Sequence, residues 1–462
     1  MNKSKKILIY GKDARTDAIV DACFRSQHRP EIYVCTEFNN PGFLRKSKGL
    51  RLLPKGGLSD LSAMVNVAEE LRPDFVIVGP EEPLGAGLVD RLEQIGIPSV
   101  GPYLQLAQIE TSKSWARELV SRVEGRINPE YRIFKSASGL KEFLQELGGF
   151  VIKPDGLTGG KGVRVSGEHL SSADEGVTYA KELLALHPCI VAEQKLEGEE
   201  FSLQTISDGY SFVHCPLAQD HKRAFENDLG PNTGGMGSYS CSDWSLPFLR
   251  TFELEEAKRI NCKVLNSVRE ETGKPYRGVL YGNYIATREG VKLIEYNARF
   301  ADPESMNILS ILDTDFVDIC EAVLSKSLAE LKITFRRKAT VCKYVVPEEY
   351  PGKPKEEERI SVSQELFDRE ELRTYFAAVN SNPEGLYLTG SRAVALVGIG
   401  ETLQEAERIA EKAANAIEGP VRHRKDVGSA KLVQSRVLHM QALREHRSSA
   451  GLSSRFLETA LN

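Results

Sequence analysis

A glycine-rich loop that carries a lysine is the first feature whose residue types could do chemistry. Residues 156–162 read GLTGGKG and follow an apolar run that ends at Lys153. Glycines let backbone N–H groups approach phosphate oxygens closely, and Lys153 and Lys161 would add positive charge there. The loop is not a Walker A motif, because Gly162 stands where that motif needs Ser or Thr. A surface hairpin turn with a solvated lysine is an equal alternative for this loop taken alone.

A strand that runs into acidic residues offers a place for a nucleoside. Residues 190–193 are strand-like and apolar up to Glu193, and Leu196 and Glu200 follow. A nucleotide base needs an apolar slot with a backbone donor and acceptor at its edge, which the segment from Glu193 to Leu196 could supply. A carboxylate such as Glu200 could accept hydrogen bonds from ribose hydroxyls. A solvated acidic turn is the competing interpretation, since charged runs are usually exposed.

A third polar segment has the residue types of a metal site. Strand alternation along residues 293–299 (LIEYNAR) puts Glu295, Asn297 and Arg299 on one face. Carboxylate and amide oxygens suit Mg²⁺ bound together with substrate phosphates, and Arg299 could clamp a phosphoryl or carboxylate group. A polar strand face turned to solvent is the alternative. The acids of residues 300–304 (FADPE) follow at once and favour a site.

The segment 218–237 is unusually polar for a structural strand and ends in GPNTGGMG. A small amino acid substrate needs a carboxylate for its ammonium group and a cation for its carboxylate, and Asp220 and Arg299 have that chemistry. We interpret His221 as a structural histidine without an acid–base role. The four segments follow one another in the chain, and their coincidence favours one nucleotide-dependent site.

Alternating strands and helices in residues 1–105 would help to position such a site. This alternation predicts parallel βαβ units, in which ligands gather at the carboxyl ends of strands. Those ends are residues 11–15 and 79–84. The expected strands cover residues 7–10, 31–35, 75–78 and 99–100, and the expected helices cover residues 16–25, 61–71 and 87–95.

The rest of the chain divides into two further units and a tail. Residues 106–330 contain both glycine-rich loops and the strand-like segments 150–153, 190–193 and 291–296. Residues 331–430 form a third unit, with strands expected at 340–346 and 392–397 and an amphipathic helix at 401–417. Residues 431–462 are a charged tail, and we expect a helix with frayed ends from about 437.

Composition excludes several classes of protein. The chain has 462 residues and a net charge of −5, without the basic footprint of a nucleic-acid-binding protein. Its N-terminal apolar run is too short for a secretion signal, and no apolar stretch is long enough to span a membrane, so we expect a cytoplasmic protein. The eight cysteines form no C-x-x-C pair, which indicates reduced thiols rather than a disulfide or zinc framework.

On these motifs the chain resembles the phosphoribosylamine–glycine ligase (glycinamide ribonucleotide synthetase) family of ATP-grasp enzymes, over nearly its whole length to about residue 430. The matching stretches include GPEEPLGAGLVD (79–90), KPDGLTGGKGV (153–163), LEGEEFS (196–202), PLAQDHKRAFENDLGPNTGGMGSYS (216–240), IEYNARFADPES (294–305) and SRAVALVGIGETLQEAE (391–407).

The resemblance implies an α/β multidomain fold. Its parts would be a Rossmann-like N-terminal domain, an ATP-grasp domain with a lid subdomain at about 113–195, and a small C-terminal α+β domain. It implies ATP, Mg²⁺ or Mn²⁺, glycine and 5-phosphoribosylamine as ligands, and a monomer or small homo-oligomer. It implies ATP binding by Lys113, Lys153, Gly159, Gly160, Lys161, Glu193, Leu196 and Glu200, metal binding by Glu295 and Asn297, and substrate contacts or catalysis by Lys161, Asp220 and Arg299.

Some residues depart from the family pattern. The first loop usually reads G-x-G-G/A-R-E-H-A, whereas residues 11–18 read GKDARTDA, with Arg15 kept. The resemblance places the sugar phosphate of phosphoribosylamine at this loop. Ala301 replaces the glycine of RFGDPE, and Gln194-Lys195 replaces a more usual acid–aromatic pair. Two alternatives therefore stay open: an ATP-grasp ligase of the same architecture that uses another amine or amino acid, and a nucleotide-binding protein without ligase activity.

Overall fold

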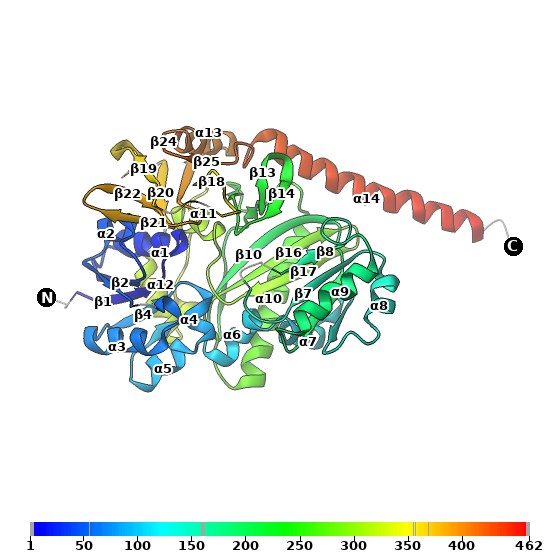
Figure 1. Ribbon diagram of the computed structural model, residues 1–462, viewed down its shortest axis with the longest axis horizontal. Coiled ribbons are helices and arrows are strands. Elements are labelled where there is room, and N and C mark those ends of the chain that lie inside the picture. Colours follow the sequence, from blue (N-terminus) through cyan, green and yellow to red (C-terminus); the bar gives the residue numbers. More distant parts are fainter. Residues whose placement is uncertain are drawn as a thin grey trace.

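The computed structural model describes residues 4–458 except 55, 159–161, 354, 356 and 368, with side chains to residue 445. Figure 1 shows the N-terminal sheet (blue) on the left, a small helix-covered sheet on the right, and the C-terminal strands above the N-terminal sheet. The multidomain α/β fold expected from the sequence is confirmed. None of the described helices combines the length and the apolar character that crossing a membrane requires.

The N-terminal sheet is parallel and five-stranded, in the order β3-β2-β1-β4-β5. In its central strand Ile7, Leu8 and Ile9 are each 0% exposed. Successive residues are apolar because both faces of a parallel sheet are covered. The strands are β1 (Lys6–Tyr10), β2 (Glu31–Thr36), β3 (Gly49–Leu52), β4 (Phe75–Val78) and β5 (Ser99–Val100). The helices are α1 (Ala14–Phe24), α2 (Pro41–Lys46), α3 (Leu61–Leu71), α4 (Glu81–Gly85) and α5 (Leu88–Gln94).

Helix α1 begins two residues before its predicted start. The carboxylate of Asp13 accepts a hydrogen bond from the backbone N–H of Thr16, which satisfies one free donor of the first turn. Asp60 caps α3 in the same way at Ala63. The predicted helix over residues 61–71 and the predicted strand over residues 75–78 are both confirmed.

A small antiparallel sheet in the order β6-β9-β7-β8 lies within the segment expected to be the lid subdomain, and we call it the lid sheet. Two helices cover one face, and Phe143, Ile152 and Ile190 belong to a core of its own. The strands are β6 (Tyr131–Phe134), β7 (Phe150–Pro154), β8 (Arg164–Val165) and β9 (Ile190–Gln194). The nearby helices are α6 (Leu104–Thr111), α7 (Lys113–Glu124), α8 (Leu140–Leu147) and α9 (Ala173–Leu184).

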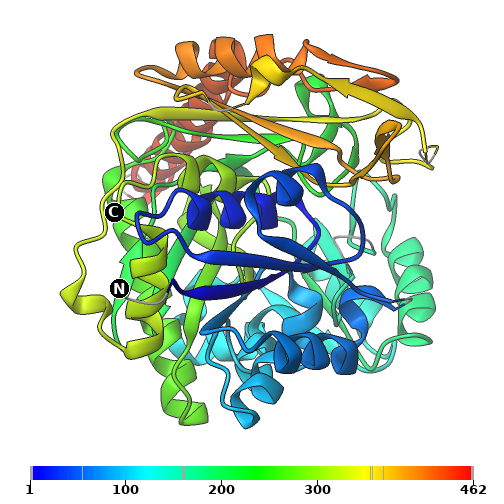
Figure 2. The same ribbon diagram turned by 90° about the vertical axis from the view of Figure 1, so that its left-hand side faces the viewer.

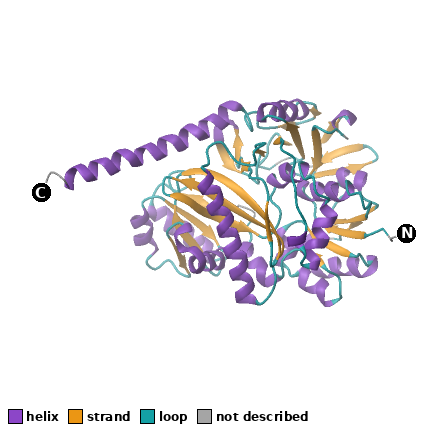
Figure 3. Cartoon of the chain, turned by 180° about the vertical axis from the view of Figure 1, so that it is seen from behind, coloured by secondary structure: helices purple, strands orange, loops and turns teal. Residues whose placement is uncertain are grey.

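The second sheet of the central region is larger, in the order β11-β10-β16-β17. Its strands are β10 (Gly198–Asp208), β11 (Phe212–His214), β16 (Arg277–Thr287) and β17 (Gly290–Asn297). The long helix α10 (Thr251–Thr272) crosses the back of this sheet, as Figure 3 shows. Helices α11 (Glu304–Ser310) and α12 (Phe316–Ser325) follow β17 and pack toward the N-terminal sheet.

A third sheet joins the central region to the C-terminal strands, because β12 and β15 extend it in the order β12-β15-β18-β23-β20. Figure 2 shows these strands above the N-terminal helices, which they contact through β20. The strands are β12 (Gln219–Asp220), β15 (Gly237–Ser240), β18 (Ala339–Pro347), β20 (Leu372–Phe376) and β23 (Val394–Gly400). Helix α13 (Leu403–Ala414) packs on β18 and β23, which confirms the predicted amphipathic helix with shorter ends.

The remaining elements lie at the edges. A four-stranded sheet contains β19 (Arg359–Val362), β21 (Val379–Asn382), β22 (Gly385–Leu388) and β24 (Ile417–Glu418), and short pairings involve β13 (Arg223–Phe225), β14 (Leu229–Asn232) and β25 (Val421–Arg422). Helix α14 (Ala430–Glu458) starts earlier than predicted, is anchored by the buried side chain of Met440, and then extends away from the body (Figure 1).

Candidate active site

One large cleft, about 890 Å³ in volume, lies between the lid sheet, the β10–β17 sheet and strand β12, and the N-terminal loops border it. It gathers nearly all the residues singled out from the sequence. The cleft is lined by Lys113, Lys153, Glu193, Leu196, Glu200, Asp220, Glu295, Asn297 and Arg299. Gly159, Gly160 and Lys161 lie outside the described residues. The cleft is therefore the candidate active site.

The glycine-rich loop is held at its base by the start of α7. The carboxylate of Asp155 accepts hydrogen bonds from the Ser114 backbone N–H at 3.1 Å and from its hydroxyl at 2.8 Å. Lys113 Nζ donates to the carbonyl of Gly156 at 2.8 Å. Burial lowers the pKa of Lys113, and nearby Glu295 offsets this only in part. The start of the loop is thus fixed beside a lysine that faces the cleft.

Glu193 holds two cations at the lid side of the cleft. Lys153 pairs with one carboxylate oxygen, and Arg117 Nη2 lies 2.8 Å from the other. Burial alone would raise the pKa of Glu193, but Arg117 and Lys153 hold it below its ordinary value. The Glu193 side chain therefore positions Lys153. The sequence analysis did not identify Arg117 as a residue of the site. The one signal for it in the sequence is its position one helical turn after Lys113.

Glu200 lies across the cleft, on β10. Lys222 Nζ donates to Glu200 Oε2 at 2.8 Å, and Asn283 Nδ2 lies 3.3 Å from the same oxygen. Burial raises the pKa of Glu200, but Lys222 outweighs it, so the pKa is lowered and the carboxylate is ionised. Lys222 belongs to the polar segment noted in the sequence, but its partner could not be predicted because Glu200 lies on another strand.

The predicted metal pair lies on β17. Glu295 and Asn297 both line the cleft, and the hydroxyl of Tyr296 between them is hydrogen-bonded to the buried Tyr284 hydroxyl at 2.9 Å. Asn283 of β16 stands opposite Glu295 in the strand pairing. Across the described ranges, no hydrogen bond or ion pair occupies the Glu295 carboxylate, although Lys222, Lys153 and Lys113 lower its pKa against the effect of burial. The amide oxygen of Asn297 accepts a hydrogen bond from Arg299 Nη2 at 3.2 Å, which a metal ion would have to replace. A carboxylate that lacks a partner among the described residues, next to this amide oxygen, has the ligand types of a Mg²⁺ site.

Arg299 has its own acidic partners. Its Nε lies 3.1 Å from Glu81 Oε2 and its Nη2 lies 3.0 Å from Glu110 Oε1. Burial raises the pKa of Glu110 to about 7, even though Arg299 opposes that shift. Arg299, two residues after β17, therefore ties this segment to the start of α4 and the end of α6, and any substrate anion at Arg299 competes with these two carboxylates.

The altered first loop also reaches the cleft. Asp13 and Arg15 line it and form an ion pair, and Arg15 Nη1 donates to the carbonyl of Phe300 at 2.9 Å. Lys12 does not form an ion pair with Asp13. Its Nζ lies instead 3.0 Å from Glu37 Oε1 and 4.0 Å from Glu82 Oε1.

Two further residues that differ from the family pattern in the first loop, Thr16 and Asp17, do not line the cleft. Both are 0% exposed. Asp17 accepts a hydrogen bond from the backbone N–H of Phe376 at 2.8 Å and one from Lys46 Nζ at 2.9 Å. It joins α1 to the C-terminal strand β20, so its role is in packing between domains.

His221 is buried beside Asp220, and neither of its ring nitrogens has a partner among the described residues. Burial and the nearby Arg424 and Arg436 lower the pKa of His221 to about 3, so the ring is neutral at physiological pH. His221 also lines the cleft, so its structural role stays a prediction.

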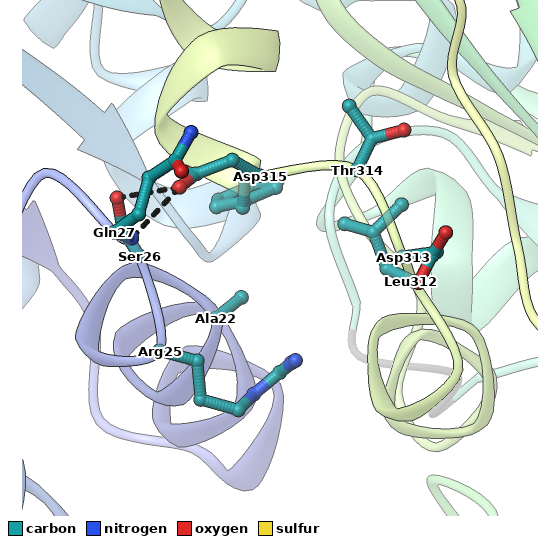
Figure 4. Close-up of a pocket in the computed structure, with 9 residues that line it drawn as sticks. Ala22, Arg25, Ser26, Gln27, Leu312, Asp313, Thr314 and Asp315 are labelled. Atoms are coloured by element: carbon teal, nitrogen blue, oxygen red, sulfur yellow. Dashed lines mark hydrogen bonds between the residues drawn. The ribbon is translucent and has the colours of Figure 1, made fainter.

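A second, smaller cavity of about 270 Å³ lies between the end of α1 and residues 312–316 (Figure 4). The Asp315 carboxylate that faces it accepts hydrogen bonds from the Ser26 hydroxyl and the Gln27 backbone, both at 2.9 Å, and caps α12. Its polar groups are used for capping and packing, and no residue singled out from the sequence lies there.

Comparison with known proteins agrees with this geometry. Residues 5–110, 111–305 and 340–430 match the N domain, the ATP-grasp (A) domain and the C domain of the phosphoribosylglycinamide synthetase family models. Phosphoribosylamine–glycine ligase from Methanocella arvoryzae is 42% identical over 95% of this chain and 100% of its own length. The enzyme of the same name from Methanocaldococcus jannaschii is 43% identical, with the same coverage.

Solved structures show the same architecture. The crystal structure of phosphoribosylamine–glycine ligase from Thermotoga maritima has a TM-score of 0.76 and 25% identity, and covers 91% of this chain and 99% of that one. The biotin carboxylase domain of the 2-oxoglutarate carboxylase from Hydrogenobacter thermophilus, solved with MgADP, has a TM-score of 0.72 at 15% identity, which shows the fold alone.

The region that matches the ATP-grasp model is the one that carries the Glu295–Asn297 pair and the cleft lysines. Fold and cleft together thus define an ATP-dependent ligase of the ATP-grasp class. All three domain models, and the two relatives that match 95% of this chain, agree on one assignment. The chain belongs to the phosphoribosylamine–glycine ligase family, whose reaction is a step of purine biosynthesis.

Proposed function

We propose that this cleft joins glycine to 5-phosphoribosylamine, giving glycinamide ribonucleotide, ADP and phosphate. Family membership over nearly the whole chain supports the reaction. The observation that carries the assignment of the site is the position of Glu295 among Lys113, Lys153 and Lys222, because this carboxylate has no hydrogen-bonding partner among the residues that the structure describes. Such a set suits a nucleoside triphosphate with its metal ion, because the lysines are opposite in charge to the phosphates and the carboxylate is opposite in charge to the metal ion.

The nucleotide would lie between the lid sheet and the β10–β17 sheet. Lys113 and Lys153 face the cleft at the lid and would contact phosphate oxygens, and the linker from Glu193 to Leu196 would border the base. Glu200, ionised and held by Lys222, would accept from the ribose hydroxyls. Gly159, Gly160 and Lys161 complete the proposed phosphate loop by position in the sequence.

Glu295 and Asn297 would hold Mg²⁺ or Mn²⁺. A metal held by these two side chains would supply positive charge that stabilises the phosphoryl group during transfer. Asn283 stands opposite Glu295 on β16 and is 2% exposed, so its amide is fixed beside the pair.

The chemistry needs no protein nucleophile. A glycine carboxylate oxygen attacks the γ-phosphorus of ATP, ADP leaves, and glycyl phosphate forms. The amine of phosphoribosylamine then attacks the carbonyl carbon, loses a proton, and expels inorganic phosphate. The chain's own cations, Lys113, Lys153 and Arg299, stabilise the transferring group electrostatically. The glycine-rich loop, held by Asp155, would exclude water that hydrolyses the acyl phosphate.

The test is ADP release measured with glycine, with and without phosphoribosylamine, combined with mass detection of glycinamide ribonucleotide. Full turnover requires both substrates. Turnover that ignores phosphoribosylamine but responds to another amine would favour the alternative ligase. Glu295→Ala should abolish turnover while ATP still binds, and unchanged turnover in this variant would refute the metal assignment.

A further inference from the structure

Helix α14 begins at Ala430, and the match to the C domain of the family ends at the same residue. The proposed reaction assigns no role to this helix. Its first half is nevertheless packed into the main core, because Val433 and Met440, two helical turns apart on one face, are 8% and 0% exposed. Figure 1 shows that this half starts beside the β13–β14 hairpin, before the helix leaves the body.

Two side chains of the same half, Arg436 and His439, line the cleft. Both contact Glu199, a buried carboxylate near the start of β10 that lines the cleft as well. Arg436 Nε lies 3.3 Å from Glu199 Oε2, and His439 Nδ1 lies 2.6 Å from Glu199 Oε1. Burial raises the pKa of Glu199, and Arg436 and His439 oppose that shift. Helix α14 thus supplies two partners to a buried acid of the cleft wall.

Gln219 links Glu199 to the next residue, Glu200, which is the carboxylate proposed for the ribose hydroxyls. Gln219 Nε2 lies 3.4 Å from Glu199 Oε2 and donates to the backbone carbonyl of Glu200 at 3.0 Å. The hydroxyl of Tyr239 donates to Gln219 Oε1 at 2.8 Å, which fixes the orientation of the amide. A movement of Glu199 therefore reaches the backbone of Glu200 through one side chain.

Arg436 has a second carboxylate partner, Asp228 of the hairpin, with which its Nη2 pairs. Asp228 has a further cation, because Arg424 Nη1 lies 3.0 Å from its other oxygen. Loss of Arg436 would therefore leave Asp228 paired with a guanidinium. Glu199 would keep, within the described ranges, the imidazole of His439 and the amide of Gln219. Glu199 is thus the carboxylate that depends more on Arg436.

We infer that Arg436 is a positioning residue for the nucleotide, and that the first half of α14 belongs to the active site. This inference rests on the proposed function, which places the ribose at Glu200. Arg436 compensates the charge of Glu199, so that a second carboxylate can stand buried next to Glu200. Without Arg436, Glu199 would take up a proton or turn toward water, and either change would move Gln219 and the backbone of Glu200.

The test measures the affinity for MgATP by calorimetric titration without glycine, together with steady-state kinetics. Arg436→Met removes the charge and keeps an unbranched side chain, and Arg436→Lys keeps the charge without the planar guanidinium. Arg436→Met is also made in a Glu199→Gln background, where no carboxylate charge is left to compensate. The control is a chain that ends after Glu445, because it keeps Arg436, His439 and Met440 in place.

Arg436→Met should raise the Kd for MgATP and the KM for ATP by about fivefold, a typical size for a coupling between contacting groups. The kcat and the KM for glycine should stay within about twofold, because Arg436 acts only on the ribose side. Arg436→Lys should recover most of the affinity. In the Glu199→Gln background, Arg436→Met should change the Kd by less than about twofold, and the shortened control should keep the Kd of the full chain.

Three results would overturn the inference: an unchanged Kd for MgATP in Arg436→Met, a loss of the same size in the Glu199→Gln background, or an equal loss in the shortened control. Thermal unfolding is measured for every variant, and recovery by Arg436→Lys separates a local effect from misfolding. Failure of the proposed function looks different, because the unaltered chain would then release no ADP with glycine and phosphoribosylamine, while the MgATP titrations would still compare the variants.

Discussion

Arg117 Nη2 and Nε lie 2.8 Å and 3.0 Å from the same oxygen of Glu193, while Lys153 pairs with the other oxygen. Arg117 also donates to the carbonyls of Leu293 and Ile294 on β17, at 3.0 Å and 2.7 Å. One buried guanidinium thus joins α7, the lid strand β9 and the strand that carries the proposed metal ligands.

Replacement of Arg117 by Ala should lower the free energy of unfolding by about 3 kcal/mol, because it leaves buried acceptors without their donor. It should also raise the KM for ATP, since Glu193 no longer holds Lys153 in a fixed place. Urea unfolding and steady-state kinetics measure the two effects. The control is Arg122→Ala on the same helix, whose 2.9 Å ion pair with Glu271 is exposed and should change stability by less than about 1 kcal/mol. Equal effects in both variants would contradict the role of Arg117.

Asp13→Asn should lower the KM for phosphoribosylamine by about threefold. Asparagine keeps the cap of α1 but removes a negative charge from Arg15, which then attracts the sugar phosphate more strongly. Asp60→Asn, at the equivalent cap of α3 and away from the cleft, should leave that KM unchanged. A higher KM in Asp13→Asn would mean that the carboxylate itself contacts the substrate.

Asp17→Ala should destabilise the fold by about 2 kcal/mol without a matching loss of kcat. The substitution leaves the buried N–H of Phe376 and the ammonium group of Lys46 without their acceptor. Thermal unfolding and turnover at saturating substrate separate the two effects. A loss of turnover with unchanged stability would place Asp17 in the site instead of the domain contact.

Stability should fall as pH rises between about 5 and 7, in part because of Glu110. Its pKa is raised by burial from 4.5 to about 7. In this range the folded protein therefore keeps a proton that the unfolded chain has released. The free energy of unfolding gained in this way is lost as pH rises through the pKa of the folded state. Glu110→Gln should flatten this part of the profile, measured by urea unfolding at several pH values. The same slope in both proteins would contradict the assignment.

The local pattern of the sequence was enough for the elements that carry the site. The predicted strands over residues 150–153, 190–193 and 291–296 correspond to β7, β9 and β17, because each is a short apolar run bounded by turns. Strand alternation predicted that Glu295 and Asn297 share one face, and both side chains line the cleft in the structure.

Contacts between distant segments could not be predicted in this way. Arg117 meets Glu193, Lys222 meets Glu200, and Arg299 meets Glu81 and Glu110 only after the domains pack. Local periodicity carries no information on such pairs, because it reports which face a residue takes and not which element lies opposite. For the same reason the first loop looked like one altered ligand site, whereas Asp17 turns toward the C-terminal sheet.

The most direct test of the proposed chemistry follows the oxygen atoms of glycine. With glycine labelled by ¹⁸O in its carboxylate, the attacking oxygen becomes the bridge of glycyl phosphate and leaves with the phosphate when the amine attacks the carbonyl carbon. The inorganic phosphate released in the complete reaction should therefore carry one ¹⁸O atom per turnover, measured by mass spectrometry or ³¹P NMR. Inorganic phosphate free of ¹⁸O, in a reaction that still forms the glycinamide product, would contradict the acyl phosphate mechanism.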